Sequence, residues 1–182
     1  MFPLVLIGIL FGLKYGIIGG LIYAIYNFGF DYLVYLETLR VTLESWTGQS
    51  WSFWKIMSLI LLDYVIPFTA FGLSGLFHKA LSNNVKMIGS LVFVSAIRLI
   101  SATLSGVILW SSSIEYAMSE VENGGNPNIA TRIFASVGES IWLYSFVYNF
   151  IYIFTTTALV ILVGIIIRKR LLLIVEPQMK PL

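Results

Sequence analysis

Residues 56–77, IMSLILLDYVIPFTAFGLSGLF, decide the fold class. A membrane-spanning helix needs roughly 20 mostly apolar residues, and this stretch reaches that length with Asp63 as its single charged side chain. Residues 87–110 and 140–167 meet the same requirement. The 182-residue chain is 58% hydrophobic and 11% charged, which is more apolar surface than a soluble protein of this size can bury. The sequence therefore predicts an all-α integral membrane protein, a polytopic helical bundle.

The N-terminal region adds two shorter apolar segments, at about 2–13 and 15–30. Lys14 interrupts the apolar run, and each half is short for a complete span. We interpret the halves as two short helices joined by a tight turn, Lys14-Tyr15-Gly16. The alternative is one long helix with a snorkelling lysine. The first interpretation gives five membrane segments in a single domain over residues 1–182.

Polar stretches at 31–55 and 111–139 are expected to be outer loops, and residues 168–182 form the tail. The second loop contains a turn signal at 123–127, NGGNP. Cytoplasmic loops are enriched in Lys and Arg. The basic residues that fall on one side of the five-segment arrangement are Lys14, Lys79, Lys86, Arg168, Lys169 and Arg170. This distribution predicts a multi-pass protein with a cytoplasmic C-terminus. Residues 171–175 either lie along the membrane surface or extend the last helix.

Two ionisable residues lie inside predicted spans, where an unpartnered charge costs a few kcal/mol or more. They are Asp63 and Arg98. Asp63 is either a ligand-binding carboxylate or one half of a structural ion pair with Arg98. For Arg98 the structural role is the stronger interpretation.

The last span carries polar side chains at helical spacing. At 3.6 residues per turn Tyr144 and Tyr148 share a face, beside a stripe that contains Ser145 and Asn149. An intramembrane asparagine pairs either with another helix or with a solute. Trp110, at an outer helix end, belongs to the aromatic belt or forms a wall for a flat or cationic ligand.

Other patterns leave alternatives open. Trp46, Trp51 and Trp54 indicate an interfacial helix or a lid in the first outer loop. Small residues recur every four positions, at Gly8, Gly12 and Gly16 and at Ser101 and Ser105. Such spacing allows close helix packing, within the bundle or against a partner subunit.

The sequence offers little for catalysis. There is no cysteine and one histidine, His78, so no cluster of metal ligands is expected. No phosphate-binding loop is present, and no base is placed to activate a serine. We therefore expect neither an enzyme nor a cofactor, and no nucleic acid as a partner. A membrane enzyme that uses Asp63 with a further acid is the remaining alternative.

Three blocks of sequence carry a family resemblance. They are LLDYVIPFTAFGLSG at 61–75, Arg98 followed by SGVILW at 105–110, and WLYSFVYN at 142–149. Together with residues 2–28 they resemble the thiamine-specific substrate-binding (S) component of energy-coupling factor (ECF) transporters. The resemblance implies a six-helix fold, of which this sequence shows five helices and lacks the first. It also implies partners: a coupling transmembrane protein and two ATPase subunits in a bacterial cell membrane.

The resemblance also implies a binding site for thiamine (vitamin B1). Its members in this sequence are Asp63, Tyr64, Gly106, Trp110, Tyr144, Tyr148 and Asn149. The acid would recognise the aminopyrimidine ring, and aromatic faces attract a thiazolium cation. A family histidine falls on Ala102, and the residue after Arg98 is Leu99 rather than an aromatic.

The expected function is therefore high-affinity capture of thiamine or a related pyrimidine for an ATP-driven importer. The alternatives are an S component for another vitamin, or an accessory membrane subunit in which Asp63 pairs with Arg98.

Overall fold

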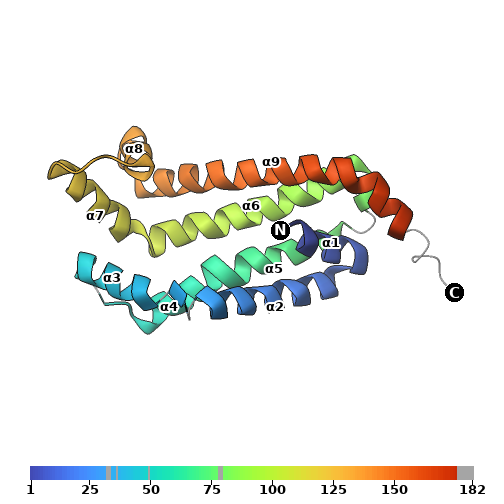
Figure 1. The fold of residues 1–182 in the computed structure, drawn as a ribbon, viewed down its shortest axis with the longest axis horizontal. Helices are drawn as coiled ribbons and strands as arrows, with labels where there is room; N and C mark the ends of the chain where they lie inside the picture. Colours follow the sequence, from blue (N-terminus) through green and yellow to red (C-terminus); the bar gives the residue numbers. More distant parts are fainter. Residues whose placement is uncertain (32–33, 36, 49, 78–79, 176–182) are drawn as a thin grey trace.

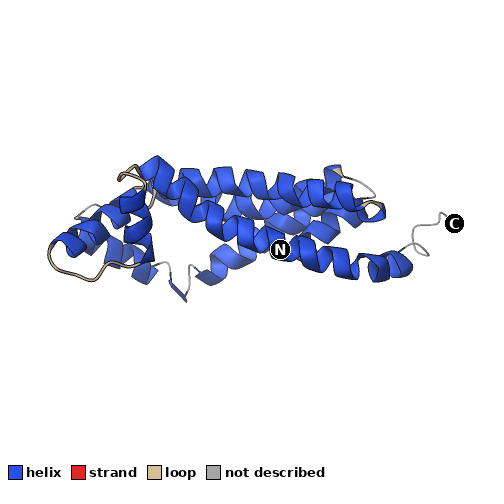
Figure 2. Cartoon of the chain, turned by 90° about the horizontal axis from the view of Figure 1, so that it is seen from above, coloured by secondary structure: helices blue, strands red, loops and turns tan. Residues whose placement is uncertain are grey.

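The chain folds into a helical bundle in a computed structural model. The structure describes residues 1–31, 34–35, 37–48, 50–77 and 80–175. His78 and Lys79, which the sequence places at the cytoplasmic rim, lie outside these residues. The described residues form helices joined by short loops and contain no strand (Figure 2). The prediction of an all-α membrane fold is confirmed.

Three helical stretches are long and apolar enough to cross a membrane within the described part of the chain. The first is composite: α4 (Phe53–Leu59), a π-helical stretch η2 (Ile60–Val65), α5 (Ile66–Gly72) and a 3₁₀ turn η3 (Leu73–Leu76). The other two are α6 (Asn84–Ile108) and α9 (Ile141–Val175), after the short turn η4 (Ala80–Ser82). α9 runs through residues 171–175, so the apolar tail extends the last helix.

The N-terminal region forms α1 (Phe2–Phe11) and α2 (Leu13–Asp31). The chain reverses at Gly12 rather than at the expected Lys14-Tyr15-Gly16. Gly12 has a φ of 88°, a backbone conformation that glycine adopts at no steric cost. Lys14 lies exposed in the first turn of α2, so its charge reaches solvent or headgroups without breaking the helix.

The long elements lie next to one another in the order α9, α6, α5, α2, and α1 packs against α2 and η3 (Figure 1). Their buried core is apolar and includes Val5, Phe71, Met87 and Leu91. The outward faces are apolar as well: in α9, Ile151 is 52% exposed and Ile166 is 68% exposed. A face of this kind is stable only when lipid covers it, which agrees with a multi-pass membrane protein.

Glycines bring α2 and α5 into backbone contact. A Cβ on Gly16 would lie 2.6 Å from the carbonyl oxygen of Gly72, and one on Gly20 would lie 2.6 Å from that of Phe68. Gly8 meets Ser74 and Gly75 in the same way. Gly8 and Gly16 therefore serve packing within the bundle.

The two stretches expected as outer loops contain short helices whose bounds the sequence did not give. They are α3 (Glu37–Thr47), α7 (Ser111–Glu122) and α8 (Ile129–Ser136), gathered at one end of the bundle (Figure 1). These short helices lack the long apolar run that marks a membrane span in a sequence, because caps and ion pairs stabilise them instead. Asn128, for example, caps α8 by accepting the N–H of Thr131 at 3.0 Å. The predicted turn at 123–127 lies between α7 and α8, where Gly124 has a φ of 95°.

Charge divides between the two ends of the bundle. Arg168 bonds to Asn84 and to the carbonyl of Ser82, so the basic end of α9 meets the start of α6. The acidic residues Glu115, Glu120 and Glu122 lie on α7, at the opposite end of α6.

Candidate functional site

A π-helical stretch positions Asp63 within the first span. In η2 the backbone N–H of Ile66 bonds five residues back to Leu61. The next bond in that register would run from residue 67 to the carbonyl of Leu62, but Pro67 has no N–H. The hydroxyl of Ser101, on α6, donates to the Leu62 carbonyl at 2.7 Å instead. Proline and serine together therefore set the local register that fixes the direction of Asp63, and π-helical turns are frequent at functional sites.

The Asp63 carboxyl lies against the end of α6. The indole Nε1–H of Trp110 donates to Asp63 Oδ2 at 3.4 Å, and the Ser105 hydroxyl lies beside the same carboxyl. Trp110 lies between α6 and α7 as the N-cap residue of α7, with φ −110° and ψ 0°. The acid is thus half-buried between polar groups rather than turned toward lipid.

Asp63 opens onto a cavity of about 280 Å³ between η2, α6 and α9. Three residues of α6 and four of α9, two of them tyrosines, contribute to its wall. The complete lining consists of Asp63, Ala102, Ser105, Gly106, Trp110, Tyr144, Ser145, Tyr148 and Asn149. Asp63 carries the single charge among these described lining residues.

Gly106 and Ser145 bring α6 and α9 together at this level. Ser145 is buried and donates to the carbonyl of Thr103 at 2.8 Å. A Cβ on Gly106 would collide with the Ser145 hydroxyl. A larger residue at position 106 would therefore push the helices apart and change the cavity.

The Asn149 amide is oriented by backbone carbonyls. Its Nδ2 donates to Ser145 O at 2.8 Å and to Ala102 O at 3.2 Å. Both amide hydrogens are used within the protein, so Oδ1 remains as the group available to a ligand. Asn149 and Asp63 thus present acceptors to the cavity.

Aromatic rings complete the wall. The Tyr144 and Tyr148 rings are 5.7 Å apart at 39°, and Phe134 of α8 packs edge-on against Tyr144 at 5.5 Å. The phenyl ring of Phe134 is buried, so it supports Tyr144 from the side of the outer helices. Offset and tilted rings of this kind suit a flat or cationic ligand.

The structure brings together six of the seven residues predicted from sequence: Asp63, Gly106, Trp110, Tyr144, Tyr148 and Asn149. Tyr64 is not among the lining residues. Its hydroxyl donates to Asp31 Oδ2 at 3.0 Å, and its ring packs edge-on against Phe28. Neighbouring residues of a helix point about 100° apart, so Asp63 and Tyr64 face different parts of the bundle.

Ser105 and Ser145 are lining residues that the site prediction missed. The sequence indicates Ser105 only as one of two small residues that favour packing, and Ser145 only as part of a polar stripe. Both lie directly beside predicted members, Gly106 and Tyr144. Their position next to predicted site residues is the feature of the sequence that could have indicated them.

Asp63 and Arg98 form no ion pair in the described part of the structure. Arg98 precedes Ser105 by seven residues, about 10 Å along a helix. Its guanidinium lies 4.7 Å from the centre of the Phe71 ring, Nη1 donates to Met1 Sδ at 3.5 Å, and Tyr152 lies beside it. The alternative in which the acid serves this arginine therefore has no support from the geometry.

A second hollow, of about 310 Å³, lies between α6 and α9 on their lipid-facing side. Its wall is apolar except for Ser95 and Thr157, which bond to each other at 2.6 Å. It is slightly larger than the Asp63 cavity but presents no free polar group. Among the described residues no cluster of three or more acids or histidines could hold a metal ion.

Comparison with known proteins places the chain beside one family. The model described as Thiamine transporter protein (Thia_YuaJ) matches residues 43–122, a range that contains Asp63, Gly106 and Trp110. No curated protein matches the chain. No solved structure matches it either. The resemblance to the thiamine transporter family, drawn first from sequence blocks, is thus confirmed over residues 43–122.

Proposed function

We propose that this chain captures thiamine in the Asp63 cavity as the substrate-binding subunit of an ECF-type importer. The observation that carries the proposal is the cavity itself, in which one carboxylate, one amide oxygen and three aromatic residues converge. The family match over residues 43–122 supports thiamine as the solute.

The chemistry of the cavity suits this ligand. Asp63 and the Oδ1 of Asn149 are acceptors, which fit the amino group of an aminopyrimidine. The single negative charge and the rings of Trp110, Tyr144 and Tyr148 fit a thiazolium cation. The volume of about 280 Å³ lies at the small end of the ~300–1,000 Å³ range of ligand sites, as expected for one small vitamin.

The rest of the proposal follows from the family resemblance. A coupling transmembrane protein and two ATPase subunits would supply the energy, because the chain has no phosphate-binding loop of its own. The complex would lie in a bacterial cell membrane, with the C-terminus of this chain in the cytoplasm.

Intrinsic tryptophan fluorescence tests the proposal. The full-length protein in detergent is titrated with thiamine, its isolated aminopyrimidine alcohol, biotin and pantothenate. We expect saturable quenching by thiamine and more weakly by the aminopyrimidine, and none by the other two vitamins. Quenching by biotin or pantothenate alone would indicate an S component for another vitamin, and no response to thiamine would refute the proposal.

Two variants identify which tryptophan gives the fluorescence quenching. Trp110→Phe is expected to remove most of the quenching, because Trp110 lines the cavity. Trp54→Phe is the matched control, since Trp54 is 76% exposed and lies outside the lining. Loss of the signal in the control but not in Trp110→Phe would place the ligand elsewhere.

A further inference from the structure

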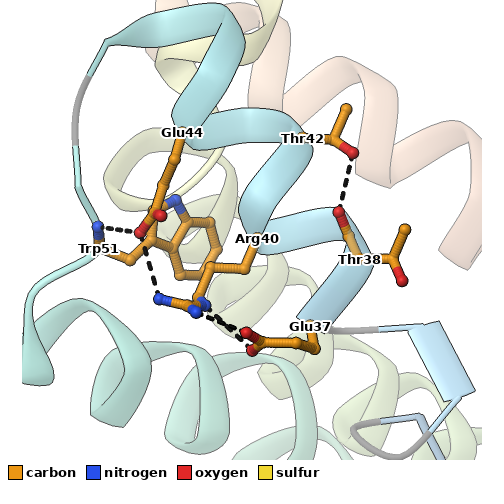
Figure 3. Close-up of polar contacts among 6 residues, drawn as sticks. All are labelled: Glu37, Thr38, Arg40, Thr42, Glu44 and Trp51. Atoms are coloured by element: carbon orange, nitrogen blue, oxygen red, sulfur yellow. Dashed lines mark hydrogen bonds and ion pairs between the residues drawn. The ribbon is translucent and has the colours of Figure 1, made fainter.

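Glu44, an acidic residue outside the cavity lining, bonds across the turn that follows α3. α3 ends at Thr47. The next residue, Gly48, has a φ of 64° and donates its N–H to the Glu44 carbonyl at 3.0 Å, which ends the helix. The returning backbone then places the N–H of Trp51 2.7 Å from Glu44 Oε1 (Figure 3). One side chain thus connects α3 to the segment that leads into α4.

The Glu44 carboxylate is itself held in place. Arg40 Nη1 approaches Glu44 Oε1 at 3.5 Å, one helical turn away (Figure 3). The same guanidinium bonds through two nitrogens to Glu37, at 2.6 Å and 3.1 Å. The Arg40 side chain is one-third exposed, so this pairing orients Glu44 more than it adds stability.

The backbone bond from Glu44 fixes a buried aromatic side chain. Trp51 is 9% exposed and packs edge-on against Trp110, with ring centres 6.0 Å apart at 67°. Leu43, Leu59 and Leu109 surround the same cluster. Trp51 thus contacts Trp110 without being one of the residues that line the cavity.

Trp110 connects the Trp51 cluster to the cavity. It lines the cavity and donates its indole N–H to Asp63 at 3.4 Å. A second contact ties α3 to the outer helices, because Trp46 stacks on Tyr116 of α7 at 5.3 Å and 7°. α3 is thus tied to Trp51, which packs on the lining residue Trp110, and to α7, which begins directly after Trp110.

We propose that Glu44 is a positioning residue that holds Trp51 against Trp110 and thereby slows the release of the bound ligand. α3 and residues 50–52 act as a cover whose closed position depends on the Glu44–Trp51 bond. The inference rests on the proposed function for the identity of the ligand, and on the geometry alone for the cover.

Three variants of the full-length protein separate the roles. Glu44→Ala removes the acceptor for the Trp51 N–H. Glu44→Gln keeps an oxygen that can accept that N–H and loses only the charge. Glu37→Ala removes the exposed partner of Arg40 and leaves Glu44 in place, so it is the matched control.

Two measurements are made on each protein. Hydrogen exchange of the segment that contains Trp51 is measured without ligand, and the dissociation rate of thiamine is measured by stopped-flow fluorescence. A hydrogen bond to a charged group contributes enough that its loss should accelerate both about tenfold in Glu44→Ala. Glu44→Gln and Glu37→Ala should remain within about threefold of the wild type.

The outcomes are distinguishable. Unchanged exchange and unchanged release in Glu44→Ala would overturn the positioning role, even where thiamine binds. Absence of thiamine binding by the wild type would refute the proposed function instead, and the exchange data would then decide the Glu44–Trp51 contact alone. If Glu44→Ala does not fold, Trp51→Leu, which keeps an apolar side chain, must show the faster release or the inference fails.

Discussion

At the scale of single residues, the surroundings of Asp63 favour a ligand-binding carboxylate over a structural ion pair with Arg98. A carboxylate within a membrane span needs a partner or access to a polar cavity. Here the carboxylate accepts the indole N–H of Trp110, lies beside the Ser105 hydroxyl, and has no ion pair with Arg98 in the described structure. The guanidinium of Arg98 contacts Phe71, Met1 and Tyr152 instead. The charges of Asp63 and Arg98 therefore lie in separate surroundings.

Tyr64 gives a test at this scale, because sequence resemblance and structure disagree about it. Tyr64→Phe removes the hydroxyl that donates to Asp31, which should lower the free energy of unfolding by about 1 kcal/mol. The thiamine dissociation constant should change less than about twofold, since a bond outside the lining is lost. Tyr144→Ala, which removes a cavity ring, should weaken binding about tenfold.

Titration calorimetry and thermal unfolding of both variants measure these effects. A large loss of affinity in Tyr64→Phe would place Tyr64 in the binding site and contradict the geometry described here.

The sequence identified Asp63 because a charge inside an apolar span is conspicuous. It also identified Tyr144, Tyr148 and Asn149 through their helical spacing, and the structure brings these four residues to one cavity. It could not exclude Tyr64, because the direction of each side chain depends on the local helical register. That register is set by Pro67 and by Ser101, which are far apart in the chain.

At the scale of elements, the π-helical stretch η2 is stabilised from outside. Its Leu62 carbonyl depends on Ser101, because Pro67 cannot donate. Spans are visible in a sequence as apolar runs, but a change of register within a span is not. Short surface helices such as α3 are equally hard to see, since their stability comes from caps, ion pairs and packing.

Ser101→Ala tests this dependence. The substitution leaves the Leu62 carbonyl without its partner in a buried setting, which should cost about 1–3 kcal/mol of stability. Because η2 carries Asp63, thiamine affinity should fall as well. Ser119→Ala is the control. The Ser119 hydroxyl donates to Tyr116 O at 2.7 Å, within its own helix, so its loss should change stability by less than about 0.5 kcal/mol.

Thermal unfolding in detergent measures both variants. Equal melting temperatures for Ser101→Ala and the wild type would show that the Leu62 carbonyl does not rely on Ser101.

At the scale of the whole molecule, the distribution of charge predicts an orientation in the membrane. The basic residues Lys86 and Arg168 lie at one end of the bundle, and the acidic helix α7 lies at the other. The cavity is near the acidic end, where α6 ends and α9 begins. The proposed capture of an external solute requires the cavity to open on the outer side, and the positive-inside rule predicts that orientation.

Introduced cysteines test this orientation, because the chain has none of its own. Glu122→Cys on α7 should react with a membrane-impermeant thiol reagent in intact cells. Lys169→Cys on α9 should react only after the membrane is made permeable. The reverse pattern would show that the predicted orientation is wrong.

The most direct test of the central claim is a thiamine titration of Asp63→Asn beside the wild type, with the melting temperature of each protein recorded. Removing the single charge of the cavity lining should weaken thiamine binding about 100-fold or more. The melting temperature without ligand should change little, because Asp63 braces no arginine. Unaltered affinity, or a severe loss of stability with no specific loss of binding, would contradict the account.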